Sequence, residues 1–271
     1  MGRIIALYFL LFAIQPAFAG GDTTFHLVKE KIIIGNYANF YTDNFGNIFL
    51  ISLNNQVKKL NQDFDSVGIF NDVRRYGDVY LLDVNNPLKI VLYYRDFTTV
   101  LVLDRFLNNR NTIDLRNAGI LQAKAITQSY DNNYWVFDEL SSKIKKIDDN
   151  GNVLLESPDF RILFSYEYNP QQIIDADGAL YLYDTKKGWL IFDYYGAFKK
   201  HMDVIGWKDV NASRNILSGH DSSAFYTIDP NTFSELKIST DIIIDKAIKV
   251  QRQLDKLLVL EKDNLTIYRI Q

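Results

Sequence analysis

The chain has 271 residues, of which 47% are hydrophobic, 14% are aromatic and none is cysteine. A chain of this length can bury one large core, and the lack of cysteine excludes disulfide scaffolds, cysteine-ligated metal centres and thiol nucleophiles. With 30 Lys and Arg against 33 Asp and Glu, the formal charge is −3, so the chain lacks the basic excess of nucleic-acid-binding proteins.

The first 19 residues have the pattern of a cleaved signal peptide. Arg3 precedes an apolar run over residues 4–14, and Ala17 and Ala19 form a small-x-small cleavage site. The run is too short for a membrane span, which takes about 20 residues, and no second run is long enough. We therefore predict that residues 1–19 are removed after Ala19, and that residues 20–271 form one soluble, exported domain in the periplasm.

Beyond residue 20 the hydrophobic pattern has a period of two, which is the period of β-strands. Tyr181 and Tyr183, for example, alternate with Leu182 and Asp184. Runs of Val, Ile, Tyr and Phe are bounded by clusters of Asn, Asp and Gly, and long amphipathic helical windows are absent. The sequence therefore predicts an all-β fold.

A strand pattern at residues 24–34 precedes a unit that recurs six times. In each unit a polar turn leads into an inner strand, and a short turn then leads into a returning strand. The units begin at residues 43, 87, 131, 177, 221 and 255, so the intervals are 44, 44, 46, 44 and 34 residues. A period of about 40 to 45 residues with several short strands indicates a β-propeller blade.

Six units over the mature length of 252 residues (271 − 19) average 42 residues, which suits one four-stranded blade each. We therefore predict a six-bladed β-propeller. The last interval is short by about one strand, and we expect the strand at residues 24–34 to complete that blade and close the ring. A seventh blade stays open if residues 60–86 hold a degenerate hairpin, and a β-sandwich or paired barrels is the remaining alternative.

No motif nominates a catalytic, metal or cofactor site. Asp175 and Asp177 have the spacing that begins a calcium loop, but no bidentate Glu follows at the right distance, so we interpret this segment as a polar turn. His26, His201 and His220 are far apart in the chain, so a hydrolytic dyad or metal site from them requires the fold. We predict no catalytic residue, no metal and no cofactor.

Most aromatic side chains at alternating strand positions are expected to pack between blades. Two aromatic segments differ, because they stand at or beside turns, where a propeller presents its binding loops. We predict partner contacts there, at Tyr94, Arg95, Phe97, Tyr166 and Tyr168.

The units resemble the blades of six-bladed NHL-like propellers, which begin with Asp-x-x-Gly-x-hydrophobic-Tyr/Phe. The composition, rich in Asn, Ile, Tyr and Lys, and the stretch 87–104 are similar to exported propellers of Bacteroidota. Among these, the chain looks like the small periplasmic subunit associated with the outer-membrane translocon of the type 9 secretion system. That resemblance implies a plug at the periplasmic opening of a translocon, and it carries over no functional residue.

Two functions follow from these patterns. The first is a non-enzymatic periplasmic binding module that docks on an outer-membrane or envelope protein complex through one rim of loops, with its oligomeric state open. The second is a propeller-type hydrolase, lactonase-like or glycan-cleaving, with a metal in the central channel. Its premise is that acids at the starts of inner strands converge on the axis; these are Asp43, Asp131, Asp177 and Asp221. The lack of a nucleophile or of metal-ligand spacing favours the first.

Overall fold

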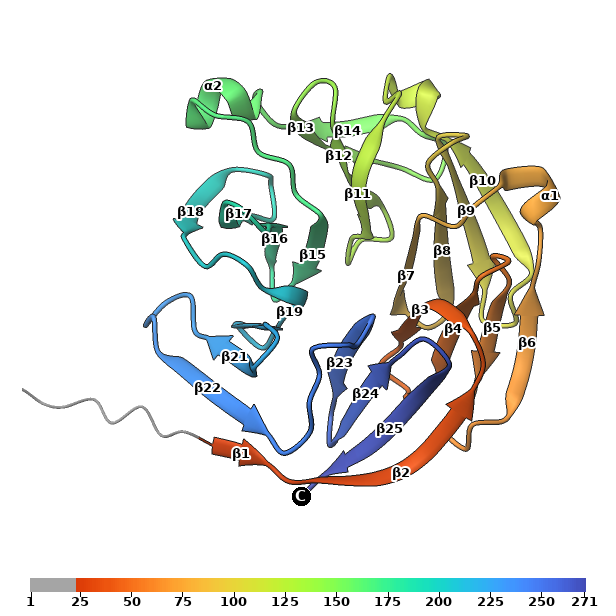
Figure 1. Ribbon diagram of the computed structural model, residues 1–271. Helices are drawn as coiled ribbons and strands as arrows, with labels where there is room; N and C mark the ends of the chain where they lie inside the picture. The colour runs from red at the N-terminus through yellow and green to blue at the C-terminus, as the bar shows by residue number, and fades with distance from the viewer. Residues whose placement is uncertain (1–22) are drawn as a thin grey trace, which may run out of the picture.

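Six small sheets surround a central axis in the computed structural model, which describes residues 23–271 (Figure 1). This arrangement is a six-bladed β-propeller, so the predicted fold class and blade number are confirmed. Residues 60–86 supply the last strand of one blade, a short helix and the first strand of the next, so the seven-bladed alternative is wrong. The predicted signal peptide, residues 1–19, lies outside the described residues.

Each of the first four blades is an antiparallel meander of four consecutive strands. Blade 1 contains β3 (Tyr37–Thr42), β4 (Ile48–Ser52), β5 (Val57–Leu60) and β6 (Ser66–Phe70). Blade 2 contains β7 (Leu81–Asn86), β8 (Lys89–Tyr94), β9 (Thr99–Asp104) and β10 (Asn109–Asp114). Blade 3 contains β11 (Ala123–Gln128), β12 (Tyr134–Asp138), β13 (Lys143–Ile147) and β14 (Val153–Glu156). Blade 4 contains β15 (Gln172–Ala176), β16 (Ala179–Asp184), β17 (Gly188–Asp193) and β18 (Phe198–Met202).

The last two blades take one strand each from the N-terminal segment. Blade 5 contains β19 (Lys208–Ser213), β20 (Ile216–His220), β21 (Ala224–Ile228) and β22 (Glu235–Thr240), and β1 (Thr23–Phe25) pairs with β22 in parallel. Blade 6 contains β23 (Lys249–Gln253), β24 (Lys256–Leu260) and β25 (Asn264–Ile270), and β2 (Leu27–Ile34) pairs with β25 antiparallel. Figure 1 shows β1 and β2 along the outside of these two blades. The prediction that the N-terminal strand completes the last blade is therefore confirmed.

The first strand of each blade is the innermost one. Consecutive first strands contact one another around the axis, and β23 of blade 6 contacts β3 of blade 1. Three short helices lie in connections between blades, namely α1 (Val73–Tyr76), the 3-10 helix η1 (Leu115–Ala118) and α2 (Phe160–Phe164). Within residues 23–271, no helix has the length and apolar character needed to cross a membrane.

The boundaries of the repeat units identified from the sequence do not coincide with the boundaries of the blades. Five of them begin at the turn between the first and second strands, so the strands taken as inner are second strands. The reason is burial: β12 is buried at every residue, whereas the innermost β23 has a single buried residue, Val250. The unit at Asp221 begins one turn later, between β20 and β21. Its true first turn is Arg214-Asn215, with φ of 53° and 55°, and it lacks the Asp that four of the other five first turns contain.

The hydrophobic core lies between blades rather than within one sheet. It consists of six clusters of buried residues, and each cluster joins two neighbouring blades. Trp135 lies between blades 3 and 4, and Trp189 and Trp207 lie between blades 4 and 5. The expectation that strand aromatics fill the space between blades is confirmed for these side chains.

The role of β2 in closing the ring can be tested with two adjacent residues. Ile33 packs against the cluster between blades 6 and 1, whereas Ile32 on the other side of the strand is 45% exposed. We expect Ile33→Ala to lower the free energy of unfolding by about 1–2 kcal/mol and Ile32→Ala to change it by less than about 0.5 kcal/mol. Urea unfolding measures both, and equal effects would show that β2 does not pack on the core.

Candidate partner-binding face

The turns of the ring fall on two faces, because every blade is an antiparallel meander around the same axis. One face, which we call the connection face, carries the links between blades and the turns between second and third strands. The other, the hairpin face, carries the turns between first and second strands and between third and fourth strands. Loops held by a rigid scaffold are the usual place of binding residues.

An apolar patch lies on the connection face over blades 2 to 4. It consists of Phe97, Leu121, Leu140 and Ile162, which are 52%, 63%, 56% and 80% exposed. Phe97 and Leu140 belong to the turns of blades 2 and 3, and the other two belong to the links that follow these blades. Four large, exposed apolar side chains in neighbouring loops mark a candidate interaction surface.

Hydrogen bonds join the loops that carry this patch. The guanidinium of Arg95 forms an ion pair with Glu139 at 2.8 Å, and the same carboxylate accepts a bond from Nε2 of Gln122 at 2.7 Å. Oγ1 of Thr98 donates to the carbonyl of Leu121 at 3.3 Å. The turn of blade 2, the link to blade 3 and the turn of blade 3 are thus held together.

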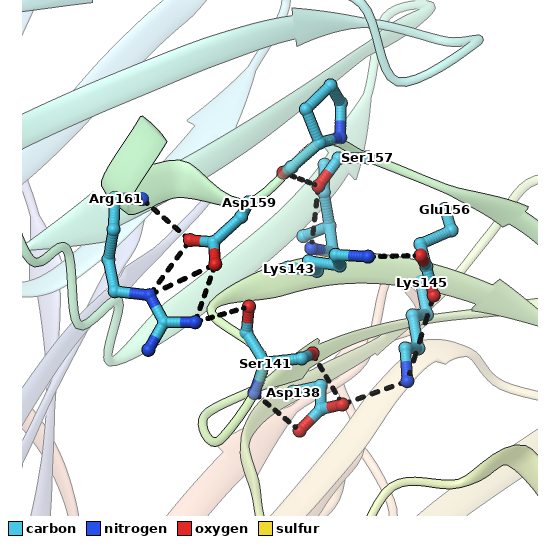
Figure 2. Close-up of polar contacts among 10 residues, drawn as sticks. Asp138, Ser141, Lys143, Lys145, Glu156, Ser157, Asp159 and Arg161 are labelled. Carbon is cyan, nitrogen blue, oxygen red and sulfur yellow. Dashed lines mark hydrogen bonds and ion pairs between the residues drawn. The ribbon is translucent and has the colours of Figure 1, made fainter. Parts of the chain in front are cut away.

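The helix α2 is tied to the same turn of blade 3 (Figure 2). Asp159 caps the helix by accepting a bond from the backbone N–H of Arg161 at 2.8 Å, and its carboxylate also binds the Arg161 guanidinium. That guanidinium donates to the carbonyl of Ser141 at 3.3 Å. The helix that carries Ile162 is therefore tied to the turn that carries Leu140.

A buried ion pair supports this turn from below. Nζ of Lys145 lies 2.9 Å from a carboxylate oxygen of Asp138, and the two side chains are only 8% and 3% exposed. The same carboxylate accepts a bond from Oγ of Ser141 at 2.6 Å (Figure 2). Because the loops are ordered before any partner arrives, little conformational entropy is lost on binding.

The structure separates the five predicted contact residues into two groups. Arg95, Phe97 and Tyr166 lie on the connection face, and their role in partner binding stays a prediction. Tyr94 and Tyr168 are only 1% exposed, so the expectation that their side chains contact a partner is corrected. Tyr94 ends β8 and packs on Tyr76 with ring centroids 5.3 Å apart. The Tyr168 hydroxyl donates to the carbonyls of Leu182 and Gly188 inside the core.

The fold also brings one histidine to a carboxylate, which the sequence spacing did not indicate. Nε2 of His220 lies 2.9 Å from Oδ2 of Asp209, and Nδ1 of His220 lies 2.8 Å from the carbonyl of Asp221. Oδ2 of Asp209 also accepts the backbone N–H of Val250 at 2.9 Å. Both imidazole nitrogens are therefore engaged, and the pair joins blade 5 to blade 6. Asp209 stands in a bulge with φ of 46°, a strained backbone conformation for a non-glycine residue.

A lysine next to this pair has an altered pKa. Nζ of Lys249, the first residue of β23, lies 3.8 Å from the ring centroid of Tyr41. Burial lowers the pKa of Lys249 from 10.5 to about 8, and the nearby Asp209 carboxylate opposes that shift. An amine surrounded by protein favours its neutral form, because its charged form loses hydration.

The four acids expected to converge at inner strands do not share one site. Asp43 accepts backbone bonds within its own turn, and Asp131 forms an ion pair with Lys146 at 2.6 Å. Asp177 accepts the N–H of Asn215 from the next blade. Asp221 lies in the turn between β20 and β21, on the other face of the ring. Over residues 23–271, no group of three or more His, Asp or Glu side chains is arranged to hold a metal ion.

Known structures share the fold of this chain at low sequence identity. No protein-family model matches the sequence, and no curated protein does. A catalytically inactive virginiamycin B lyase from Staphylococcus aureus, with quinupristin, is 10% identical with a TM-score of 0.62 over 90% of this chain and 99% of the other. The Neurospora crassa Pan2 WD40 domain is 12% identical, with a TM-score of 0.61 over 89% and 80%. A putative exported protein from Bacteroides fragilis is 10% identical, with a TM-score of 0.58 over 95% and 98%.

The buried ion pair below the patch should be important for stability. Asp138→Ala leaves the buried Lys145 ammonium with only the more distant Glu156 carboxylate, at 3.8 Å, and we expect the free energy of unfolding to fall by about 2–3 kcal/mol. Asp159→Ala removes a partly buried helix cap from the same region and should cost clearly less, because no buried charge loses its partner. Urea unfolding of both variants measures the difference, and equal losses would contradict a special role for the buried pair.

The lowered pKa of Lys249 predicts a pH dependence of stability. Between pH 8 and the ordinary lysine pKa of 10.5, the unfolded chain binds the proton more readily than the folded chain, so stability from this group rises with pH. Below pH 8 both states hold the proton and the contribution is constant. We expect wild type to gain about 1 kcal/mol or more over Lys249→Met between pH 7 and pH 10. A difference that stays constant over this range in urea unfolding would contradict the lowered pKa.

Proposed function

We propose that this protein is a non-enzymatic docking module whose connection face binds another protein of the cell envelope. The observation that carries the proposal is the apolar patch of Phe97, Leu121, Leu140 and Ile162, formed by neighbouring loops of three blades. Large exposed apolar side chains gathered in neighbouring loops commonly mark an interface.

The surroundings of the patch suit an interface as well. Arg95, Glu139 and Arg161 lie beside the apolar side chains and are already engaged in ion pairs. A central apolar area with a polar rim is the common anatomy of protein interfaces, in which a few buried anchors provide most of the binding energy. Ile162 and Leu140 are the anchors that we propose.

The cellular setting of the proposal comes from the sequence. The predicted signal peptide, with cleavage after Ala19, supports a periplasmic mature protein of residues 20–271. The resemblance to the propeller subunit of the type 9 translocon supports an outer-membrane translocon as the specific partner. In that role the connection face would seat against the periplasmic opening of the channel, and the rigid ring would act as a plug.

The docking role predicts a loss of binding from changes on one face only. We expect Ile162→Glu combined with Leu140→Glu to reduce capture of the translocon channel subunit at least about tenfold, because two charges would be buried in the interface. Leu254→Glu is the matched control, since Leu254 is 75% exposed on the hairpin face. The measurement is affinity capture from solubilised native envelopes, with the channel subunit quantified by mass spectrometry.

The midpoint temperature of thermal unfolding should be nearly the same in wild type, the double variant and the Leu254→Glu control, because the substituted side chains are exposed. Capture that is equally weak for wild type and for the double variant would refute the proposal. So would a loss of capture with Leu254→Glu alone.

A further inference from the structure

A tyrosine platform lies on the hairpin face over blades 3 and 4, away from the apolar patch. Tyr130 comes from the turn between β11 and β12, and Tyr194 and Tyr195 come from the turn between β17 and β18. Their exposed fractions are 61%, 36% and 70%. The ring centroids of Tyr130 and Tyr194 are 5.0 Å apart, and those of Tyr194 and Tyr195 are 4.5 Å apart. Two blades thus present three contiguous phenol rings to solvent.

A buried lysine holds this platform from below. Nζ of Lys146 lies 5.3 Å from the ring centroid of Tyr130, 5.6 Å from that of Tyr194 and 5.0 Å from that of the buried Trp135. The Lys146 side chain is 4% exposed and forms an ion pair with Asp131 at 2.6 Å. Cation–π contacts of this kind restrain the rings, so a ligand that stacks on them immobilises little that is not already ordered.

A groove of about 540 Å³ lies on the same face over blades 2 and 3. This volume is within the range of small-ligand sites. The turn that carries Tyr130 also supplies Asn132 to the groove, so this turn stands between the groove and the platform. The polar side chains that line it are Lys89, Asp104, Arg110, Asn111, Asn132 and Asp149.

The charges of the groove balance one another. Lys89 forms an ion pair with Asp149 at 3.0 Å, and Arg110 forms one with Asp104 at 2.6 Å. A phosphate or another strongly charged ligand would have to displace one of these partners. The groove therefore suits a neutral ligand with many hydroxyl groups, to which carboxylate, guanidinium and amide side chains offer both acceptors and donors.

We propose that the groove and the platform together bind a neutral oligosaccharide. The C–H face of one sugar ring would stack on the phenol rings of Tyr195 and Tyr130. The hydroxyls of the neighbouring sugar would exchange hydrogen bonds with Asn132, Asp149 and Arg110. This binding is independent of the docking role of the connection face, because the two surfaces lie on opposite faces of the ring.

The test is calorimetric titration of the whole mature protein with maltohexaose, cellohexaose and chitohexaose. We expect at least one of them to bind with a Kd below about 1 mM. Tyr195→Ala should weaken that binding about threefold to tenfold, because it removes the most exposed ring of the platform. Arg110→Ala should weaken it as well, since the guanidinium lies in the groove and is 65% exposed.

Phe45→Ala is the matched control. Phe45 lies in the turn between the first and second strands of blade 1, on the same face as Tyr195. The two turns have the same local pattern, with an Asp two residues before the aromatic residue and a glycine of positive φ after it (Gly46 at 76°, Gly196 at 82°). Phe45 is 59% exposed and lies three blades away, so its removal should leave the affinity unchanged.

Three results would overturn the proposal. The first is that none of the three hexasaccharides binds at millimolar concentration. The second is that Tyr195→Ala and Phe45→Ala weaken binding equally. The third is that Tyr195→Ala and Arg110→Ala abolish capture of a protein partner while no hexasaccharide binds, which would make this surface a protein interface instead.

Discussion

The contact between neighbouring blades is the constraint on which the rest of this structure depends. A single four-stranded sheet has two apolar faces and cannot bury both alone, so each blade needs a neighbour on either side and the ring must close. The six core clusters follow this rule, since each joins two blades. Polar contacts near the axis join the same sheets. Asp83 of blade 2 accepts bonds from Oγ1 of Thr127 and the N–H of Gln128 in blade 3.

These contacts also explain why both faces of the ring are available for recognition. The apolar interior provides the stability, so the turns are free to carry exposed side chains such as Ile162 on one face and Tyr195 on the other. The connection face is rich in exposed aliphatic residues, whereas the platform on the hairpin face is made of phenol rings. The same scaffold thus presents two chemically different surfaces, one suited to a protein and one to a polar ligand.

The fold class and the number of blades could be predicted because the second and third strands are so strongly buried. Strands such as β12 produce a clear apolar signal that recurs once per blade. The innermost strands have mixed burial, because they line the axis, and so the sequence units were displaced by one strand. The turn at Arg214-Asn215 shows the limit of local reasoning, since Asn215 is its only residue that favours positive φ, and a single Asn is a weak turn signal.

The candidate site was predictable only in part. Arg95 and Phe97 could be located because the turn beside β8 is visible in the sequence. Tyr94 and Tyr168 looked similar, but whether a side chain beside a turn is buried depends on residues that only the fold brings against it. The ion pair of Arg95 with Glu139 and the pairing of His220 with Asp209 join residues that only the fold brings together. No sequence pattern distinguishes Leu140 and Ile162 as binding residues, since isolated apolar residues in loops are common.

One stretch of chain at the N-terminus pairs with two sheets at once, β1 with blade 5 and β2 with blade 6. Leu27 lies opposite Ile270, so strands that are more than 200 residues apart in the sequence must meet before the ring is closed. Until they pair, the edges of two sheets stay open. Such non-local closure slows folding. It slows unfolding as well, because opening the ring requires two sheets to separate together. A cysteine-free protein can in this way be durable through kinetics, with a slow rate of unfolding in place of covalent cross-links.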